Sequence, residues 1–510
     1  MWLRRLSTDR VARRGDAPGD APLILVEPVK SALRVQALND AAAALGLMPD
    51  LPLADVRAMY PGIIVREADR AADHALLEAV ADWCDRYTPL VGLDPPNGLL
   101  LDISGCAHLF GGERALGRDL IARLQRQGLA ARLGLADTPG AAIAVARYGH
   151  QRLVAPGDTR AALLPLPLAA LRLPGETVAA LAQAGLRRIA DIAARPRAPL
   201  AARYGEHLLR RLDQALGHEE ESIAPRLPVP AYVAERRFPE PIARSEDVLG
   251  VIAQLAGDLS RMLERRGAGA RHLQAALFRA DGAVHRIGAG TAAPLRDAVR
   301  MARLFAERLA AIGDACDPGF GYDMVRLSAL VAEPLAPAQS GLDSTDRAAA
   351  LAHLIDRLGA RFGASRLTRP LPRDSHVPER AVAAVPAQTA GGLPWRDVAP
   401  PAQDSLAPLR PLRLLAPPEP IEDVISEVPD GAPAQFRWRG VRHVVAAAEG
   451  PERIAMEWWA GAAGEAPRDY FRVESRDGLR AWIFRQDRRG RDDAGAATRT
   501  TRWLLHGLFA

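Results

Sequence analysis

The chain has 510 residues, of which 48% are apolar and 25% charged, a composition typical of soluble globular proteins. This length predicts three or four domains at about 100 to 200 residues each. No apolar run approaches the ~18 residues that a membrane span needs, and Met1 to Arg14 lacks the apolar core of a secretory signal. We therefore expect a cytoplasmic protein without a membrane partner.

Three cysteines lie far apart, so neither a disulfide framework nor a zinc site is predicted. The net charge of +5 is mild evidence for a polyanionic partner, although many proteins that bind none share it.

The most informative stretch runs from Tyr87 to Gly112. Its apolar run Leu99 to Ile103 lies between clusters of turn formers, which predicts a buried strand entered through a tight turn. The stretch resembles the palm of Y-family DNA polymerases. The motifs Asp102 to Gly105 and Leu109 to Gly111 fix the register of this resemblance without a gap.

In that register the metal-binding positions of the family have lost their carboxylates. The family's Asp-Glu pair falls on Asn97 and Gly98, and its remaining ligands fall on Trp2 and Arg4. Nucleotidyl transfer uses two divalent ions, which need carboxylates to hold them. We therefore predict no metal, no cofactor and no catalytic residue. Asp102 remains, but we interpret it as a strand-end residue that bonds nearby backbone.

The contacts to an incoming nucleotide are missing as well. The segment Val35 to Pro61 resembles the fingers, and the family's Tyr and Arg that contact the triphosphate fall on Asp40 and Ala43. The lysine of a later motif falls on Ile143. Asp9 could replace a metal ligand, but we expect it in the first turn of a helix instead. The resemblance therefore implies that catalysis has been lost as a whole.

Palm and fingers are expected over residues 1–160. Within them, Ala71 to Asp85 and Glu113 to Gln127 have apolar residues at helical spacing, which predicts two helices packed on one face of the palm sheet.

A helical thumb is expected over residues 161–230. Leu171 to Gly175 resembles a helix-hairpin-helix, whose backbone N–H groups bind a DNA phosphate, so Pro174 and Gly175 are candidate DNA-binding residues. Thr177 replaces the second glycine of the family hairpin, which weakens the prediction of phosphate binding but not that of the fold.

Residues 235–333 have the order strand, helix, strand, helix, strand that the resemblance assigns to a little finger, the DNA-gripping domain of the family. Arg265, Arg266 and Arg271 are the candidate DNA-binding residues here. The alternative is that these arginines belong to solvated helix faces.

A Pro/Ala-rich linker with one helix near Ser344 to Phe362 is expected over residues 334–430. At its start, Gln339 and Leu342 have the spacing of the extended peptide with which polymerases bind the sliding clamp. A chance match within a linker is the alternative.

Residues 434–510 are rich in aromatic residues in short alternating segments, which predicts a small antiparallel β domain. Arg468 to Glu474 and Arg502 to Ala510 resemble the C-terminal region of ImuB proteins, the catalytically degenerate branch of the Y-family. We expect a partner-binding segment here, with these candidate residues: Trp503, Leu504, Leu508 and Phe509.

Together these features predict an α+β multidomain protein with a palm, fingers, thumb, little finger and C-terminal β-rich domain. The resemblance implies a non-catalytic adaptor in damage-induced translesion synthesis and mutagenesis. Its partners would be DNA, the sliding clamp, an ImuA-type recombinase-like protein and the alpha subunit of an error-prone replicative-type polymerase. Two alternatives stay open: an active translesion polymerase with unrecognised metal ligands, and a DNA-binding structural protein without a polymerase partner.

Overall fold

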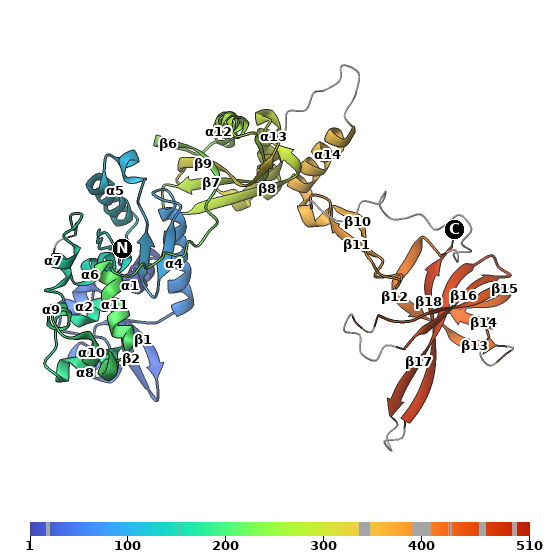
Figure 1. Ribbon diagram of the computed structural model, residues 1–510, viewed down its shortest axis with the longest axis horizontal. Helices are drawn as coiled ribbons and strands as arrows, with labels where there is room; N and C mark the ends of the chain where they lie inside the picture. The colour runs from blue at the N-terminus through green and yellow to red at the C-terminus, as the bar shows by residue number, and fades with distance from the viewer. Residues whose placement is uncertain are drawn as a thin grey trace. The chain divides into compact units, whose positions relative to one another are not determined.

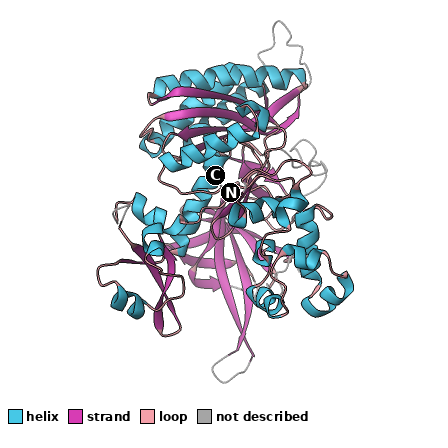
Figure 2. Ribbon diagram, turned by 90° about the vertical axis from the view of Figure 1, so that its left-hand side faces the viewer, coloured by secondary structure: helices cyan, strands magenta, loops and turns pink. Residues whose placement is uncertain are grey.

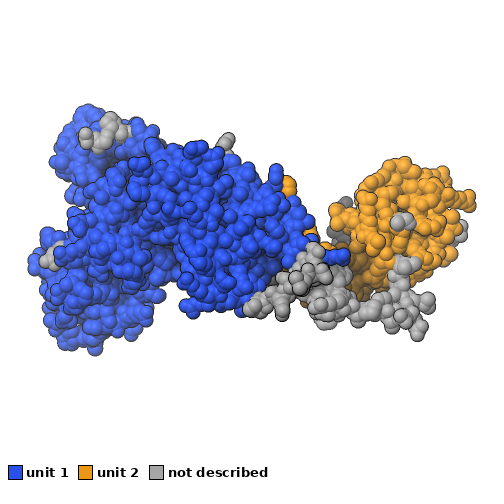
Figure 3. Space-filling view, turned by 90° about the horizontal axis from the view of Figure 1, so that it is seen from above, with its two compact units in different colours: residues 1–361 blue, residues 362–510 orange. Residues whose placement is uncertain are grey.

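The computed structural model separates the chain into two compact units, Met1–Arg361 and Phe362–Ala510 (Figure 3). It describes residues 1–16, 21–150, 152–335, 347–389, 410–426, 428, 431–457, 459, 466–491 and 497–509. Most of the helices lie in the first unit, and the second unit consists mainly of strands (Figure 2). No helix within these described residues is long and apolar enough to cross a bilayer.

The palm is built on a short antiparallel hairpin, β4 (Val91–Asp94) with β5 (Gly98–Leu101), next to helix α1 (Leu6–Arg13). Helices α4 (Arg70–Cys84) and α5 (Glu113–Arg126) fall within one residue of the predicted ranges and pack on this hairpin (Figure 1). Asp69 starts α4 because its carboxylate accepts the N–H of Ala72 at 2.9 Å. The shared core contains Leu77, Val80, Trp83, Leu99, Leu116, Leu120 and Leu124.

The fingers form a three-stranded sheet in the order β2-β1-β3. Its strands and the two helices beside it are β1 (Leu23–Val29), β2 (Ala32–Leu38), β3 (Ile64–Glu67), α2 (Asp40–Ala44) and α3 (Leu53–Met59). Asn39 ties the sheet to α2, because its amide oxygen accepts the N–H groups of both Leu23 and Ala42.

The thumb is a cluster of short helices around an apolar core of leucines and isoleucines. Its elements are α6 (Pro139–Tyr148), α7 (Thr159–Leu163), η2 (Leu168–Leu171), α8 (Gly175–Gln183), α9 (Ile189–Ala193), α10 (Arg197–Tyr204) and α11 (Glu206–Leu216). Between η2 and α8 the chain turns at Arg172, whose φ of 58° lies in the left-handed region. Its guanidinium is held at 2.7 Å by Glu221, which fixes the turn.

The little finger is an antiparallel sheet in the order β6-β9-β7-β8 with two long helices packed on it. Its elements are β6 (Tyr232–Ile242), α12 (Ser245–Arg265), β7 (Ala268–Arg279), β8 (Val284–Leu295), α13 (Ala298–Ile312), η3 (Gly313–Cys316) and β9 (Tyr322–Pro334). The order strand, helix, strand, helix, strand that was predicted from the sequence did not include β8. This strand carries Gly288 and Gly290 among alanines, residues with low β propensity, and it forms because β7 provides a full pairing partner.

Helix α14 (Arg347–Phe362) corresponds to the helix predicted near Ser344 to Phe362. It is attached to the little finger, since Asp356 accepts the N–H of Ala292 at 2.6 Å and Arg357 pairs with Glu307 at 2.9 Å.

The second unit contains a hairpin and a seven-stranded antiparallel sheet. After η4 (Ala364–Arg366), its strands are β10 (Thr368–Pro372), β11 (Val382–Pro386), β12 (Arg413–Pro420), β13 (Glu422–Ser426), β14 (Pro433–Trp438), β15 (Val441–Ile454), β16 (Arg468–Ser475), β17 (Arg480–Arg491) and β18 (Ala497–Leu508). The sheet order is β12-β18-β17-β16-β15-β14-β13, with β12 and β13 at opposite edges. Only Ile421 separates these two strands in the chain, so the sheet must curl until its edges approach each other.

The predicted boundaries in this region are wrong. Strands β12 and β13 precede residue 434 and form both edges of the C-terminal sheet, and the β10–β11 hairpin lies within the range predicted as a linker, 334–430. The prolines of β12 suggested a linker, but an edge strand tolerates proline, and the pairing of β12 with β18 is irregular between Leu414 and Glu419.

Candidate functional site

The palm brings three of the four degenerate metal positions side by side. Trp2 pairs with Gly98 as an isolated β-bridge, and the N–H of Leu3 donates to the carbonyl of Asn97 at 2.8 Å. The indole N–H of Trp2 also donates to the amide oxygen of Asn97 at 3.2 Å. Both oxygens of Asn97 therefore accept hydrogen bonds from the neighbouring strand segment, and none of these three positions provides a carboxylate.

An acid that the sequence analysis did not single out, Asp94, lies next to this site. A Cβ built on Gly98 would lie 2.6 Å from Oδ2 of Asp94, so residue 98 has no room for a side chain in this conformation. Oδ2 of Asp94 is bound by Arg147 at 2.7 Å, and both side chains are largely buried. One neutralised carboxylate does not provide the ligands that two divalent ions require.

The fourth position, Arg4, faces the fingers instead. Its guanidinium lies 3.6 Å from Asp40, and the neighbouring Arg5 approaches the same carboxylate at 2.9 Å. A cation thus occupies a palm position where the resemblance expects an acid, and an acid occupies a finger position that should contact a triphosphate. The palm position has a reversed charge, the finger position has an acid in place of the family's neutral tyrosine, and the two side chains pair with each other beside a pocket of about 410 Å³.

The remaining predicted positions have structural roles. Asp9 lies in the first turn of α1 as predicted, and its carboxylate accepts the N–H of Ala130 at 2.8 Å while burial raises its pKa. Asp102 accepts the N–H of Ser104 at 2.9 Å, the backbone-bonding role expected for it. Ile143 is buried within α6.

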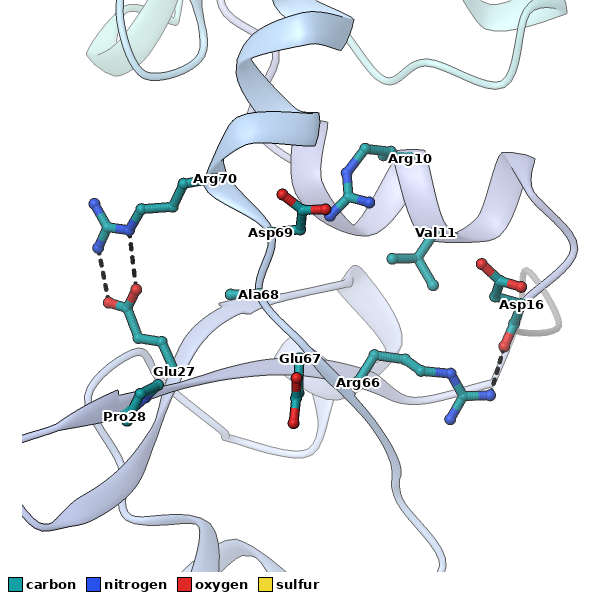
Figure 4. Close-up of a pocket in the computed structure, with 10 residues that line it drawn as sticks. All are labelled: Arg10, Val11, Asp16, Glu27, Pro28, Arg66, Glu67, Ala68, Asp69 and Arg70. Carbon is teal, nitrogen blue, oxygen red and sulfur yellow. Dashed lines mark hydrogen bonds and ion pairs between the residues drawn. The ribbon is translucent and has the colours of Figure 1, made fainter.

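A larger pocket of about 700 Å³ lies where α1, β1, β3 and the start of α4 meet (Figure 4). Three of its charged side chains are held in ion pairs: Arg70 holds Glu27 through two hydrogen bonds of 2.8 and 2.9 Å, and Arg10 binds Asp73 at 2.6 Å. The hydrogen bonds from Arg70 lower the pKa of Glu27. Throughout the described residues, no three His, Cys, Asp or Glu side chains are grouped as a metal site.

The candidate DNA-binding residues differ in how accessible they are. Gly175 is the first residue of α8 and Pro174 its N-cap, as the predicted hairpin requires. Arg265 ends α12 and Arg266 follows it; both are exposed, with no hydrogen-bond or ion-pair partner for their side chains in the described part of the chain. The prediction for Arg271 does not fit, because its side chain is only 12% exposed and donates to the carbonyl of Ala292 at 2.9 Å.

The sequence analysis missed a buried set of charges between the palm and the little finger. Asp323 of β9 is bound by Arg86, which follows α4, and by Arg123 of α5, the latter at 2.7 Å. The Arg86 and Asp323 side chains are only 6% and 12% exposed.

The same contact continues along the sheet of the little finger. Arg286 of β8 binds Asp85 at 2.5 Å. The ring of Phe278 lies 5.5 Å from the guanidinium carbons of both Arg86 and Arg326. We call Asp85, Arg86, Arg123, Phe278, Arg286, Asp323 and Arg326 the palm–little finger network.

The predicted clamp residues, Gln339 and Leu342, lie outside the described residues. Of the predicted partner-binding residues, Trp503 packs on Phe471 with 5.6 Å between ring centres, and Leu504 packs against the aromatic cluster of Tyr470, Trp482 and Phe484. Leu508 and Phe509 line a groove on the C-terminal sheet. Trp503 and Leu504 therefore belong mainly to the packing of the sheet.

The fold and the site define a chain of the Y-family polymerase type whose palm lacks carboxylates at the expected positions. The impB/mucB/samB family matches residues 14–147, and the impB/mucB/samB family C-terminal domain matches residues 230–346. Residues 417–509 match a domain of unknown function, DUF6504, which begins within β12.

Individual relatives define the branch. The chain is 43% identical over 476 residues to Protein ImuB of Caulobacter vibrioides, with 91% of this chain and 100% of the relative covered. It is 25% identical to DNA polymerase IV of the same species, over 63% of this chain and 80% of that protein. A crystal structure of DinB from Sulfolobus solfataricus is 12% identical and covers 66% of this chain and 98% of its own, with a TM-score of 0.38. The chain belongs to the ImuB family.

Proposed function

We propose that this protein is a non-catalytic adaptor of damage-induced translesion DNA synthesis. One observation carries the proposal: at the palm, Trp2, Asn97 and Gly98 form bonds among themselves, and Arg4 pairs with Asp40 of the fingers. A polymerase needs anionic ligands in the palm and cations that contact the triphosphate, whereas here a palm ligand position is an arginine and the finger positions provide an acid and an alanine.

The adaptor binds DNA without reading its sequence. The start of α8 at Gly175 and the exposed side chains of Arg265 and Arg266, which have no partner among the described residues, support this part of the proposal, because backbone N–H groups and arginines bind phosphates. The sliding clamp is bound through Gln339 and Leu342, and the C-terminal unit recruits an ImuA-type protein and an error-prone replicative-type polymerase that performs the synthesis.

Primer extension with the purified protein tests the absence of catalysis. We expect no template-dependent extension with Mg²⁺ or Mn²⁺. Extension that is abolished by Asp94→Ala or Asp102→Ala would instead show that the protein is an active polymerase using one of these acids, and it would overturn the proposal.

Clamp recruitment is tested separately with the double variant Gln339→Ala and Leu342→Ala. We expect it to lose binding to the sliding clamp while it remains folded and binds DNA, because an extended peptide contributes little to the packing of either unit. Unchanged clamp affinity would place the clamp site elsewhere.

A further inference from the structure

A groove of about 790 Å³ crosses the C-terminal sheet. The strand register defines its path: Arg413 of β12 pairs with Leu508 of β18, Leu508 with Ala481 of β17, and Val473 of β16 with both Ala481 and Ala448 of β15. The groove therefore extends over five neighbouring strands of one unit.

The groove is lined by residues from both faces of the curled sheet. Along β16, Val473 belongs to the inner core and also lines the groove, whereas Arg472 and Glu474, which line it too, alternate with Val473. Successive side chains of a strand point to opposite faces, so Arg472 and Glu474 point away from this core, and Leu508, which packs against the core, lines the groove beside them.

The groove combines apolar side chains with a basic rim. Leu412 is fully exposed, and Leu508 and Phe509 are half-buried. Four arginines and two glutamates line the groove, and Glu452 pairs with one of these arginines, Arg410, so these seven residues have a net charge of +1. Arg472 and Arg480 pair with Glu449 and Glu474, but Arg413 is exposed and has no hydrogen-bond or ion-pair partner for its side chain among the described residues.

We propose that this groove is the recruitment site for an acidic peptide segment of a partner protein, an inference that rests on the proposed adaptor function. An aliphatic or aromatic side chain of the partner packs on Leu412, Leu508 and Phe509. A neighbouring carboxylate of the partner is bound by Arg413, because a guanidinium binds a carboxylate through two parallel hydrogen bonds. A basic peptide is disfavoured by the net positive charge of the rim.

Fluorescent peptides test this recognition with the full-length protein. The first probe, about 12 residues long, carries one leucine flanked by Asp and Glu; the second replaces those acids with lysine. The groove variant is Leu412→Glu with Arg413→Glu. The matched control is Val441→Glu with Arg442→Glu, an apolar–arginine pair on β15 in which Val441 is 55% exposed.

We expect the acidic probe to bind the wild type at least about tenfold more tightly than the lysine probe. The groove variant should lose at least about tenfold in affinity for the acidic probe, and the control variant should keep the wild-type affinity. Equal affinities for the two probes, or equal effects of the two variants, would overturn the proposal. Self-association that only the groove variant abolishes would also overturn it, because the occupant would then be a second copy.

Partner pull-downs distinguish this inference from the proposed function. If deletion of residues 362–510 releases the ImuA-type protein and the polymerase but the groove variant does not, the groove proposal fails and the adaptor role stands. If the acidic probe binds the groove but the intact chain captures neither partner, peptide recognition stands and the adaptor role fails.

Discussion

The pair between the palm and the fingers, Arg4 with Asp40, and the ion pairs of the palm–little finger network are built from the same two residue types, arginine and aspartate, in different surroundings. Between the palm and the fingers, the side chains of Arg4 and Asp40 are 54% and 60% exposed. In the network, those of Arg86 and Asp323 are 6% and 12% exposed. An exposed pair contributes little to stability, whereas removing one partner of a buried pair leaves a desolvated charge. Arg4 thus stands where the resemblance expects a metal-binding acid, whereas Arg86 stabilises the contact between the palm and the little finger.

The replacement of Asp323 with Ala is expected to give the largest effect. It leaves Arg86 buried without its carboxylate and removes one of the two carboxylate partners of Arg123, which keeps Asp119, so the first unit should lose about 3 to 5 kcal/mol of stability. Asp40→Ala is the control and should cost less than ~1 kcal/mol, since water replaces its partners. Chemical denaturation monitored by tryptophan fluorescence measures both, and similar losses would contradict the comparison.

The DNA-binding prediction concerns Arg265 and Arg266, which belong to neither of these two regions. Charge reversal of Arg265 and Arg266 should weaken binding to a primer–template duplex about tenfold or more, and it should reduce the salt slope of binding by about 0.9 for each lost phosphate contact. Arg271→Gln is the control within the same domain, because Arg271 is bonded to Ala292. Anisotropy titrations at several salt concentrations measure the slope. If the affinity of the wild type for DNA does not change with salt, phosphate contacts are not the main contribution to the free energy of DNA binding.

The features predicted correctly from the sequence are those that depend on local apolar periodicity or on a motif that aligns without a gap. The apolar spacing located α4 and α5 within one residue, and the palm motif placed Asn97 and Gly98 beside Trp2. It missed β8, because glycine and alanine do not signal a strand, and β12, because its prolines resemble a linker. The pairing of Arg86 with Asp323 joins residues 237 positions apart, which no local pattern reveals.

The stability should also depend on pH at the edge of the palm–little finger network, where Arg326 pairs with Glu235. Burial alone would raise the pKa of Glu235 in β6, but ion pairs and hydrogen bonds from Arg326 and Arg237 hold it below its ordinary value. A carboxyl whose pKa is lower in the folded state contributes stability above its unfolded pKa, about 4.5, and loses it as the pH falls through the folded pKa.

Glu235→Gln should therefore cost about 1 kcal/mol at pH 7 and have a smaller effect with increasing acidity. Denaturation at pH 7 and at successively lower pH values measures the difference, with Glu246→Gln on the exposed start of α12 as the control. A constant cost at every pH would show that Glu235 acts through packing rather than charge.

The smallest expected effect comes from restoring acids to the palm. The double variant Arg4→Asp and Asn97→Asp reinstates two carboxylates at a cost below ~1 kcal/mol for the exposed Arg4–Asp40 pair. Primer extension should nevertheless remain at background. Asp40 and Ile143 still provide no cation for a triphosphate, and Gly98 has no room for a glutamate beside Asp94.

The outcome shows whether the loss of catalysis depends on the palm acids alone or also on the nucleotide-binding positions. An active Y-family polymerase under the same conditions is the positive control, and Mn²⁺ binding to the variant shows whether the new acids form a metal site. Extension by the double variant would mean that the nucleotide cradle survives and that two substitutions separate this chain from catalysis. Mn²⁺ binding without extension would show that the missing cations at the nucleotide-binding positions, as well as the missing palm acids, prevent polymerisation.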